Sequence, residues 1–273
     1  MIELNLREED IETLITDLYE FYGYDFSHYA RASLRRRVNR IMVIDRFPSF
    51  AELQYRVRND AEYVTHLIEE ITVNVTEMFR DPQAFKVLRE KVLPDLATQP
   101  LIRIWHAGCA TGEEVYSMAI LLEEAGLLNK SLLYATDLNP TVIDNVKQGI
   151  FSMNHMQQFS ENYMASGGKK DFSSYYTAQY GLAKFDDRLK SKMIVSTHNL
   201  VSDRSFNEFH LIICRNVLIY FDKELQNRVL TLFDESLDAL GYLMLGSKEN
   251  IRFSPIARNF RQIGTERIWR KMK

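Results

Sequence analysis

The first hundred residues carry their hydrophobic side chains at the spacing of amphipathic helices. The first apolar stripe, which precedes Gly23, consists of Ile11, Leu14, Ile15, Leu18 and Tyr22. Further helices are expected to begin near Ser27, at residues 48–49 and at Asp60. A fifth is expected at Asp81-Pro82, because Asp can cap free amides and Pro fits a first turn. The pattern predicts an all-helical N-terminal region.

From residue 101 onwards, short apolar runs alternate with amphipathic helices. Strands are expected at 102–107, 132–136, 193–197, 209–214 and 242–245. Helices are expected at 112–125, 140–149 and 223–239, and residues 261–272 can form a closing hairpin. The alternation of buried strands with helices predicts an α/β fold with a doubly wound, mainly parallel sheet.

Residues 151–188 fit neither pattern. The stretch combines polar residues with aromatic rings and glycine turns, and 175–186 contains short β-prone pieces. It is predicted to be a small antiparallel β insertion, and its composition favours a partner-binding module over a part of the main core. The predicted organisation is a helical domain over residues 1–80 and an α/β domain over 81–273, with the insertion at 151–190.

Composition narrows the class of protein. The chain has 273 residues, 46% of them hydrophobic, which suffices for one substantial core and a smaller second domain. Its formal net charge of -3 favours neither nucleic acid nor a membrane surface as partner. Cys109 and Cys214 lie in apolar strand-like segments, which indicates a reducing compartment. With no signal-peptide pattern and no bilayer-length apolar stretch, a soluble cytoplasmic protein is expected.

The turn after the first predicted strand is the first candidate for chemistry. Gly108 and Gly112 would let the backbone approach a nucleotide-like ligand at the sheet edge, although a G-x-x-x-G spacing favours a diphosphate less than G-x-G-x-x-G does. Glu113 and Glu114 either complement the helix dipole or bind an amino group of the ligand. Asp137 either accepts ribose hydroxyls or caps the following helix. The histidines show no metal-ligand spacing, so no metal is predicted.

Six short motifs follow one another along the chain, at 74–80 (NVTEMFR), 108–117 (GCATGEEVYS), 135–139 (ATDLN), 198–200 (HNL), 214–222 (CRNVLIYFD) and 245–250 (LGSKEN). Together they resemble the chemotaxis receptor methyltransferase family, CheR, over about residues 8 to 270. The resemblance implies a Rossmann-like methyltransferase domain behind an all-helical domain. One departure is Lys248, which stands where a His is common.

The resemblance also implies an activity. Enzymes of this kind transfer a methyl group from S-adenosylmethionine to glutamate side chains of methyl-accepting chemotaxis receptors, and leave S-adenosylhomocysteine. The glutamate methyl esters serve sensory adaptation. The implied partner is the cytoplasmic helical region of a receptor, met by a monomeric enzyme without membrane insertion and without nucleic acid. In some relatives a β insertion grips a receptor C-terminal tail, and that contact is open here.

Residue by residue, the resemblance gives each motif a role. The implied cofactor-binding set is Asn74, Thr76, Arg80, Gly108, Glu114, Asp137, Asn199, Leu200, Arg215 and Asn216. Within it, Glu114 would bind the methionine end and Asp137 the ribose, while Arg80 reaches over the cofactor. Arg80 and Tyr220 form the implied catalytic pair, with Tyr220 near the transferred methyl.

These residues suit a displacement without a general base. A glutamate carboxylate has an ordinary pKa of about 4.3, so it is ionised at neutral pH and can attack the sulfonium methyl directly. Arg80 could hold that carboxylate through two parallel hydrogen bonds, and Tyr220 could donate another. Taken alone, Arg80 could equally be a solvated arginine at a helix start, and Tyr220 an aromatic at the edge of the core.

The second predicted helix offers a docking surface. Arg36 and Arg40 lie opposite its apolar stripe and Arg37 flanks it, so the three could face acidic receptor helices or could simply be solvated. Two rival functions also stay open at this point. One is methylation of a protein other than a chemoreceptor, or of a small acid, and the other is an inactive adaptor that binds the cofactor.

Overall fold

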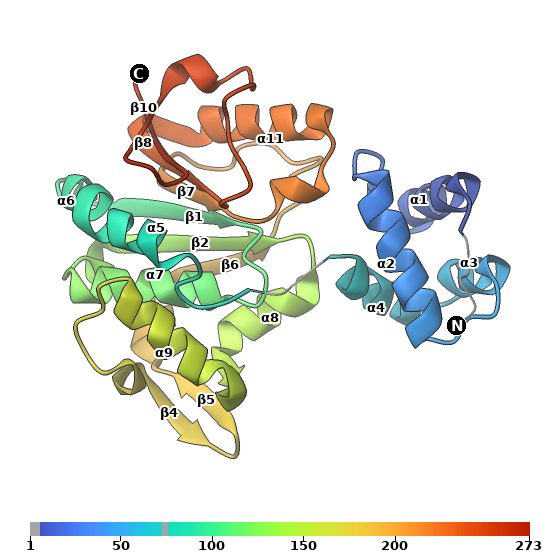
Figure 1. Cartoon of the computed structure of the whole chain (residues 1–273), viewed down its shortest axis with the longest axis horizontal. Helices are drawn as coiled ribbons and strands as arrows, with labels where there is room; N and C mark the ends of the chain where they lie inside the picture. Colours follow the sequence, from blue (N-terminus) through green and yellow to red (C-terminus); the bar gives the residue numbers. More distant parts are fainter. Residues whose placement is uncertain (1–5, 73–75) are drawn as a thin grey trace. The chain divides into compact units, whose positions relative to one another are not determined.

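The computed structural model describes residues 6–72 and 76–273, which form two compact units (Figure 1). Unit 1 comprises residues 1–73 and 220–228, and unit 2 comprises 74–219 and 229–273. A segment from late in the chain therefore belongs to the N-terminal unit. The predicted division at residues 80 and 81 differs from this one, because residues 74–80 and the helices of 82–96 belong to unit 2 and residues 220–228 to unit 1.

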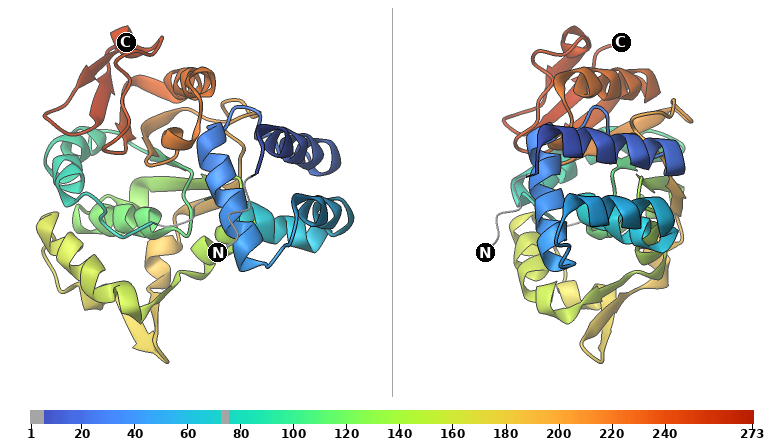
Figure 2. Two further views of the ribbon diagram at one scale, coloured as in Figure 1. Left: turned by 45° about the vertical axis from the view of Figure 1, so that its right-hand side comes forward. Right: turned by 90° about the vertical axis from the view of Figure 1, so that its right-hand side faces the viewer.

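Unit 1 is helical, as predicted, and Figure 2 shows the helices of its N-terminal part in blue to cyan. They are α1 (Glu8–Tyr22), α2 (Arg31–Ile44), α3 (Phe50–Asn59) and α4 (Ala61–Ile71). Gly23 ends α1 in the left-handed conformation, while the side chains of Ser49 and Asp60 cap α3 and α4. The buried interior includes Leu14, Leu18, Val38, Leu53, Val57, Leu67 and Ile71.

The helix expected near Ser27 begins four residues later. Residues 28–30 pair instead with the late segment of the same unit: Tyr29 forms a bridge with Phe221, and the Ala30 amide donates to the Tyr220 carbonyl over 2.9 Å. The Asp222 amide donates to the carbonyl of His28. The pairing of residues 28–30 with 220–222 thus replaces the first turn of the predicted helix, and no feature of the local sequence predicts it.

Unit 2 is built on a seven-stranded sheet of order β6-β2-β1-β7-β8-β10-β9. Its strands are β1 (Ile102–Ala107), β2 (Ser131–Asp137), β6 (Met193–Thr197), β7 (Phe209–Cys214), β8 (Leu237–Leu245), β9 (Phe260–Gln262) and β10 (Ile268–Lys271). β6, β2, β1, β7 and β8 run parallel, whereas β10 is antiparallel to β8 and β9. The predicted doubly wound, mainly parallel sheet with a closing hairpin is confirmed.

Three helices of unit 2 precede β1 in the sequence, and the others lie between the strands. They are α5 (Pro82–Val87), the π-helix η1 (Leu88–Val92), α6 (Leu93–Leu96), α7 (Glu113–Glu124), α8 (Pro140–Gln148), α9 (Met156–Ala165), α10 (Asp187–Lys190) and α11 (Lys223–Ser236), the last of which starts in unit 1. Short 3-10 turns occur at η2 (Leu128–Lys130), η3 (Met153–His155), η4 (Phe172–Tyr175), η5 (Leu218–Tyr220) and η6 (Ala257–Asn259). Across the described ranges, 6–72 and 76–273, no helix has the length and apolar character that a membrane crossing needs.

The strand order places a switch point between β1 and β7. From β1 the chain continues outward to β2 and β6 on one side, whereas β7 leads to β8 on the other. In such sheets, ligands bind outside the carboxyl ends of the strands where the order reverses. The loops after β1, β2 and β7 hold residues 108–112, 138–139 and 215–217, so the fold brings three of the predicted motifs to one edge.

The predicted β insertion is a three-stranded antiparallel sheet of order β3-β5-β4, with β3 (Ile150–Ser152), β4 (Tyr176–Gln179) and β5 (Leu182–Phe185). The sequence analysis missed α9, which lies within it. The aromatic rings of the insertion are buried in the same hydrophobic core as the main sheet, and include Phe151, Phe159, Tyr163, Phe172, Tyr175 and Phe185. Packing therefore accounts for most of its aromatic composition.

Candidate functional site

The glycine turn after β1 requires both of its glycines. Gly108 and Gly112 have φ angles of 80° and 99°, where a side chain is strained. A Cβ at Gly108 would lie 2.5 Å from Cγ2 of Val217, and one at Gly112 would lie 2.9 Å from Cγ2 of Val146. Val217 belongs to the loop after β7, so the two loops that border the switch point are in direct contact.

Asp137 closes β2 and holds this turn. Its carboxylate accepts hydrogen bonds from the Ala110 and Asn139 amides, each over 3.0 Å. Capping of α8 falls to Asn139, whose side-chain oxygen accepts from the Thr141 amide. Burial raises the pKa of Asp137 above its ordinary value, and these amide bonds oppose the rise. A carboxylate has about four acceptor positions, so Asp137 retains capacity for ligand hydroxyls.

Four charged or titratable side chains form a chain of contacts at the switch point, called here the Glu114 network: Asp81, Arg215, Glu114 and His106. Arg215 donates to both carboxylates, Asp81 on one side and Glu114 on the other, the latter over 3.3 Å. The second oxygen of Glu114 lies 3.0 Å from Nδ1 of His106. Burial alone would raise the pKa of Glu114, but the His106 hydrogen bond and the Arg215 charge hold it below its ordinary value. Glu114 is therefore ionised at neutral pH.

The helix start expected at Asp81-Pro82 is confirmed, since α5 begins at Pro82, but capping by the Asp81 side chain is wrong. Its side chain makes no capping hydrogen bond, and its backbone is left-handed with φ of 56°. The carboxylate binds Arg215 instead, which lies 134 positions further along the chain. A charge-assisted contact to a buried arginine is stronger than an ordinary capping bond, so it takes the side chain away from the helix.

Arg80 is held between two anchored neighbours. Phe79 is left-handed with φ of 52°, its ring is buried, and its amide donates to Oγ of Ser117 over 2.9 Å. Asp81 on the other side is fixed by Arg215. Two non-glycine residues in this conformation cost about 1–3 kcal/mol each and persist only where the surroundings impose them. Arg80 itself is half-buried, and among the described residues its guanidinium has no hydrogen bond or ion pair.

The loop after β7 is fixed by a residue that the sequence analysis did not single out. The buried carboxylate of Glu249 accepts hydrogen bonds from the amides of Gly246, Asn216 and Ile219, over 2.7, 3.0 and 3.3 Å. Asn216 is left-handed, and its buried Oδ1 has no partner within the described part of the chain. Glu249 lies four positions after the end of β8, within the motif at 245–250, and that motif was the available signal.

Family models match both parts of the chain. The all-alpha domain of CheR methyltransferase matches residues 9–72, and the SAM-binding domain of CheR methyltransferase matches residues 74–268. The chain belongs to the CheR methyltransferase family. It is thus a member of a family of S-adenosylmethionine-dependent methyltransferases, and the resemblance inferred from the six motifs is confirmed.

Relatives in this family extend over most of the chain. The provisionally named methyltransferase Cher3 of Pseudomonas putida is 47% identical over 268 residues, which cover 97% of this chain and 98% of the relative. A chemotaxis protein methyltransferase of Listeria monocytogenes is 30% identical and covers 84% of this chain and 85% of its own. One from Borreliella burgdorferi is 28% identical over 92% and 91%.

The structure brings part of the predicted CheR cofactor set together. Gly108, Glu114, Asp137, Arg215 and Asn216 all lie in or beside the loops at the switch point. The loop with Asn199 and Leu200 follows β6, and the His198 amide at its start donates to the Asp137 carbonyl over 3.0 Å. Thr76 lies in an irregular segment of unit 2, and Asn74 lies outside the described residues. The specific contacts of these residues with a cofactor stay predictions.

The residues present fit S-adenosylmethionine. The close turn at Gly108 and Gly112 admits a ligand near the backbone, and Asp137 can accept hydroxyl hydrogens. The ionised Glu114 carboxylate suits an ammonium group, and the unpartnered Oδ1 of Asn216 needs a donor. Within the described ranges, no group of three or more His, Cys, Asp or Glu side chains is arranged to hold a metal ion.

Tyr220, the second predicted catalytic residue, belongs to unit 1, whereas Arg80 belongs to unit 2. The Arg37 guanidinium lies 4.2 Å from the centre of the Tyr220 ring, and it also donates to the Ile71 carbonyl. Arg37 is buried, so the expectation of three exposed arginines on α2 is wrong for this residue. Arg36 and Arg40 are exposed, and Arg40 lies 3.8 Å from Glu70.

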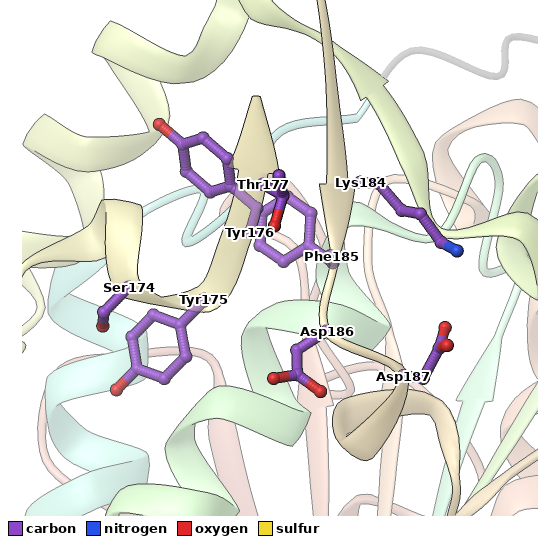
Figure 3. A pocket seen from close by; sticks show the side chains of 8 residues that line it. All are labelled: Ser174, Tyr175, Tyr176, Thr177, Lys184, Phe185, Asp186 and Asp187. Carbon is purple, nitrogen blue, oxygen red and sulfur yellow. The ribbon is translucent and has the colours of Figure 1, made fainter. Parts of the chain in front are cut away.

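A separate pocket of about 290 Å³ lies in the β insertion (Figure 3). It is lined by Ser174, Tyr175, Tyr176, Thr177, Lys184, Phe185, Asp186 and Asp187. It shares no residue with the switch-point loops. The pocket therefore gives no support to the cofactor site, and its position on β4 and β5 makes it a feature of the insertion.

Proposed function

We propose that this CheR-family methyltransferase transfers the methyl group of S-adenosylmethionine to glutamate side chains of methyl-accepting chemotaxis receptors. The observation that carries the proposal is the connection of Arg80 to the cofactor site through its neighbour Asp81. Asp81, next to Arg80, is bound by the same Arg215 that pairs with Glu114. The backbone on both sides of Arg80 is thereby anchored, which supports a role of its side chain in orienting a carboxylate near the methionine end. The relatives named chemotaxis protein methyltransferases support the choice of substrate.

Each cofactor group has a proposed holder. Asp137 accepts the ribose hydroxyls, Glu114 binds the ammonium of the methionine end, and Asn216 accepts from a ligand donor. Asn199 and Leu200 are proposed to border the adenine, and Asn74, Thr76 and Arg80 to reach over the cofactor. The bound cofactor supplies an electrophilic sulfonium methyl.

The protein's own task is alignment. The substrate glutamate is ionised at neutral pH and needs no base. Arg80 holds its carboxylate in line with the methyl through a forked contact, while Tyr220 donates a hydrogen bond near the transferred group. Arg37 stacks on the Tyr220 ring and restricts its orientation. Alignment and the exclusion of water can together supply several kcal/mol of the barrier reduction.

Receptor docking is proposed for the helical domain, predicted over residues 1–80 and found as unit 1, with the α/β unit 2, which includes Arg80, as the catalytic part. Exposed Arg36 and Arg40 present positive charge to the acidic cytoplasmic helices of a receptor. We further propose that the pocket of the β insertion, lined by residues 174–177 and 184–187, contacts a receptor C-terminal tail. The partly exposed Tyr176 and the charged Lys184, Asp186 and Asp187 suit a short peptide.

The arginine contribution can be measured through the receptor Michaelis constant. Replacing Arg36 and Arg40 together by Ala should raise it several-fold at low salt, with unchanged cofactor affinity, because exposed charges act mainly on encounter. The effect should shrink at high salt as the charges are screened. Equal Michaelis constants for the double variant and the parent at low salt would assign these arginines to solvent only.

The activity itself is tested with labelled cofactor and receptor-containing membranes. Base-labile label on the receptor, located on glutamates by mass spectrometry, is the expected result. Label on another protein or on a small acid would redirect the substrate assignment. Tight cofactor binding without transfer to any acceptor would favour an adaptor, and the same assay with Arg80→Ala separates enzymatic label from background.

A further inference from the structure

His106 is a buried titratable residue for which the sequence motifs give no role. It lies on β1 between Trp105 and Ala107, pairs in register with Ala135 on β2 and Ile213 on β7, and is fully buried. Its Nδ1 lies 3.0 Å from Oε1 of Glu114. Because Glu114 is ionised and can only accept, Nδ1 carries the proton and donates.

The two partners of Glu114 act on different oxygens. Arg215 binds Oε2 and His106 binds Oε1. An arginine facing a carboxylate favours the bidentate arrangement, in which both oxygens turn towards the guanidinium. His106 keeps one oxygen away from Arg215. With one donor on each oxygen, each oxygen retains about one acceptor position that is not engaged by His106 or Arg215.

A histidine at this buried position costs free energy, so its presence needs a compensating contact. Nε2 of His106 is buried and has no partner in the described part of the chain, and the same holds for Nε of Arg215. An unsatisfied buried polar atom costs about 1–3 kcal/mol. An apolar residue on β1 would avoid the Nε2 cost, so the hydrogen bond to Glu114 is the feature that a histidine contributes here.

We propose that His106 is a positioning residue, which acts through Glu114 to hold a carboxylate ready for the ammonium of the methionine end of S-adenosylmethionine. The inference rests on the proposed role of Glu114 in cofactor binding. It predicts that loss of His106 weakens binding of ligands with the amino-acid end and spares ligands without it. 5′-Methylthioadenosine, which has the nucleoside and thioether but no amino-acid end, is the matched probe.

The decisive variants are His106→Asn and His106→Gln, both polar and uncharged. The Asn amide nitrogen can take the place of Nδ1 and donate to Glu114, whereas the Gln amide extends towards the place of Nε2. Calorimetry should give near-parental S-adenosylmethionine affinity for His106→Asn and about tenfold weaker binding for His106→Gln, equivalent to ~1.4 kcal/mol. Methylthioadenosine affinity should be the same in the parent and both variants.

A general structural role would produce a different result. If His106→Gln weakens methylthioadenosine as much as S-adenosylmethionine, or if Asn and Gln behave alike, the positioning role is overturned. Glu114→Gln tests the underlying assumption separately, because it should itself lower only S-adenosylmethionine affinity. Adding His106→Gln to Glu114→Gln should then cost little more, since coupled residues are not additive. Unchanged affinity in Glu114→Gln would instead sink the proposed role of Glu114.

Discussion

Helix α7 carries a buried glutamate at each end, and the two differ in how fully they are satisfied. Glu114, in the first turn, accepts from His106 and Arg215. Glu124, at the last position, accepts from Arg89 over 2.6 Å, from the Tyr163 hydroxyl over 2.5 Å, and from the Tyr175 hydroxyl and the Lys169 amide, each over 3.2 Å.

The difference separates a structural carboxylate from one kept for a ligand. Four donors use the acceptor capacity of Glu124 and tie α7 to η1 and to the β insertion. At Glu114 only two donors are present, so acceptor positions remain for a ligand. In both cases a neighbouring arginine and hydrogen bonds hold the pKa below its ordinary value against the effect of burial. Charge state therefore does not distinguish Glu114 from Glu124. The number of hydrogen-bond donors that each carboxylate accepts from does distinguish them.

The largest change in the free energy of unfolding is expected at Glu124, the glutamate whose acceptor positions are all used. Glu124→Gln leaves Arg89 as a buried, unpaired charge and should lower the free energy of unfolding by about 3–5 kcal/mol, measured by urea denaturation. Cofactor affinity of the folded protein should not change. Glu123→Gln, at the adjacent position with the exposed partner Arg188, is the matched control and should cost about 1 kcal/mol or less. A loss of cofactor affinity in Glu124→Gln would break the comparison.

Arg80→Ala should act mainly on turnover, and cofactor affinity should fall less, since Asp137 and Glu114 still hold the ribose and amino ends. Without the guanidinium the substrate carboxylate loses its orienting partner, so turnover at saturating receptor and cofactor should fall by about 100-fold or more. Arg80→Lys should recover only part, because an ammonium cannot make the forked contact. Thermal unfolding should be unchanged, since the side chain has no partner among the described residues. Near-parental turnover in Arg80→Ala would refute the proposed mechanism.

Asp137→Ala should weaken cofactor binding by about 1–3 kcal/mol, the cost of leaving ligand hydroxyls without an acceptor. Isothermal calorimetry measures it directly. Asn139→Ala, two positions away, removes the cap of α8 and should cost about 1 kcal/mol of stability with little change in affinity. Unchanged affinity in the Asp137 variant would remove this residue from the site.

The smallest effect concerns Glu113, next to Glu114. Burial raises its pKa to about 7, while the Thr111 hydroxyl partly opposes the rise. Because the pKa is higher in the folded than in the unfolded state, its contribution is fully present at pH 4 and is lost as pH rises to 7 and beyond. Relative to Glu113→Gln, the parent should lose about 1–2 kcal/mol between pH 4.5 and 8 in urea denaturation, after allowance for its partial exposure. Parallel pH profiles would contradict the shift.

Local patterns sufficed for the buried strands. The predicted ranges 102–107 and 209–214 coincide with β1 and β7, because a buried apolar run between turns leaves few alternatives, and 193–197 coincides with the edge strand β6, which has no buried residue. The cofactor loops could be located from glycine spacing and family motifs. Helix α9 was missed, since its polar stretch has only three buried residues, Met156, Phe159 and Tyr163.

The errors share a physical origin in contacts between residues distant in sequence. Asp81 has the sequence of a helix cap, but Arg215 takes its carboxylate. Arg37 has the spacing of an exposed arginine, but it is buried on the Tyr220 ring. His106 and Glu249 act through partners that no spacing rule relates to them. Periodicity predicts which face of a helix or strand is buried. It does not predict which charged side chains form contacts between residues distant in sequence.

The inclusion of residues 220–228 in unit 1 has a consequence during synthesis on the ribosome. Roughly 150 residues separate this segment from the end of α4, and at about 5–20 residues per second their translation takes roughly 7–30 s. Throughout that interval the nascent helices lack Tyr220 for Arg37, and Tyr29 lacks the Phe221 ring that later lies 5.1 Å away. The first unit to emerge can therefore be completed only after most of the second has been made, and chaperones can meet its open aromatic face in the meantime.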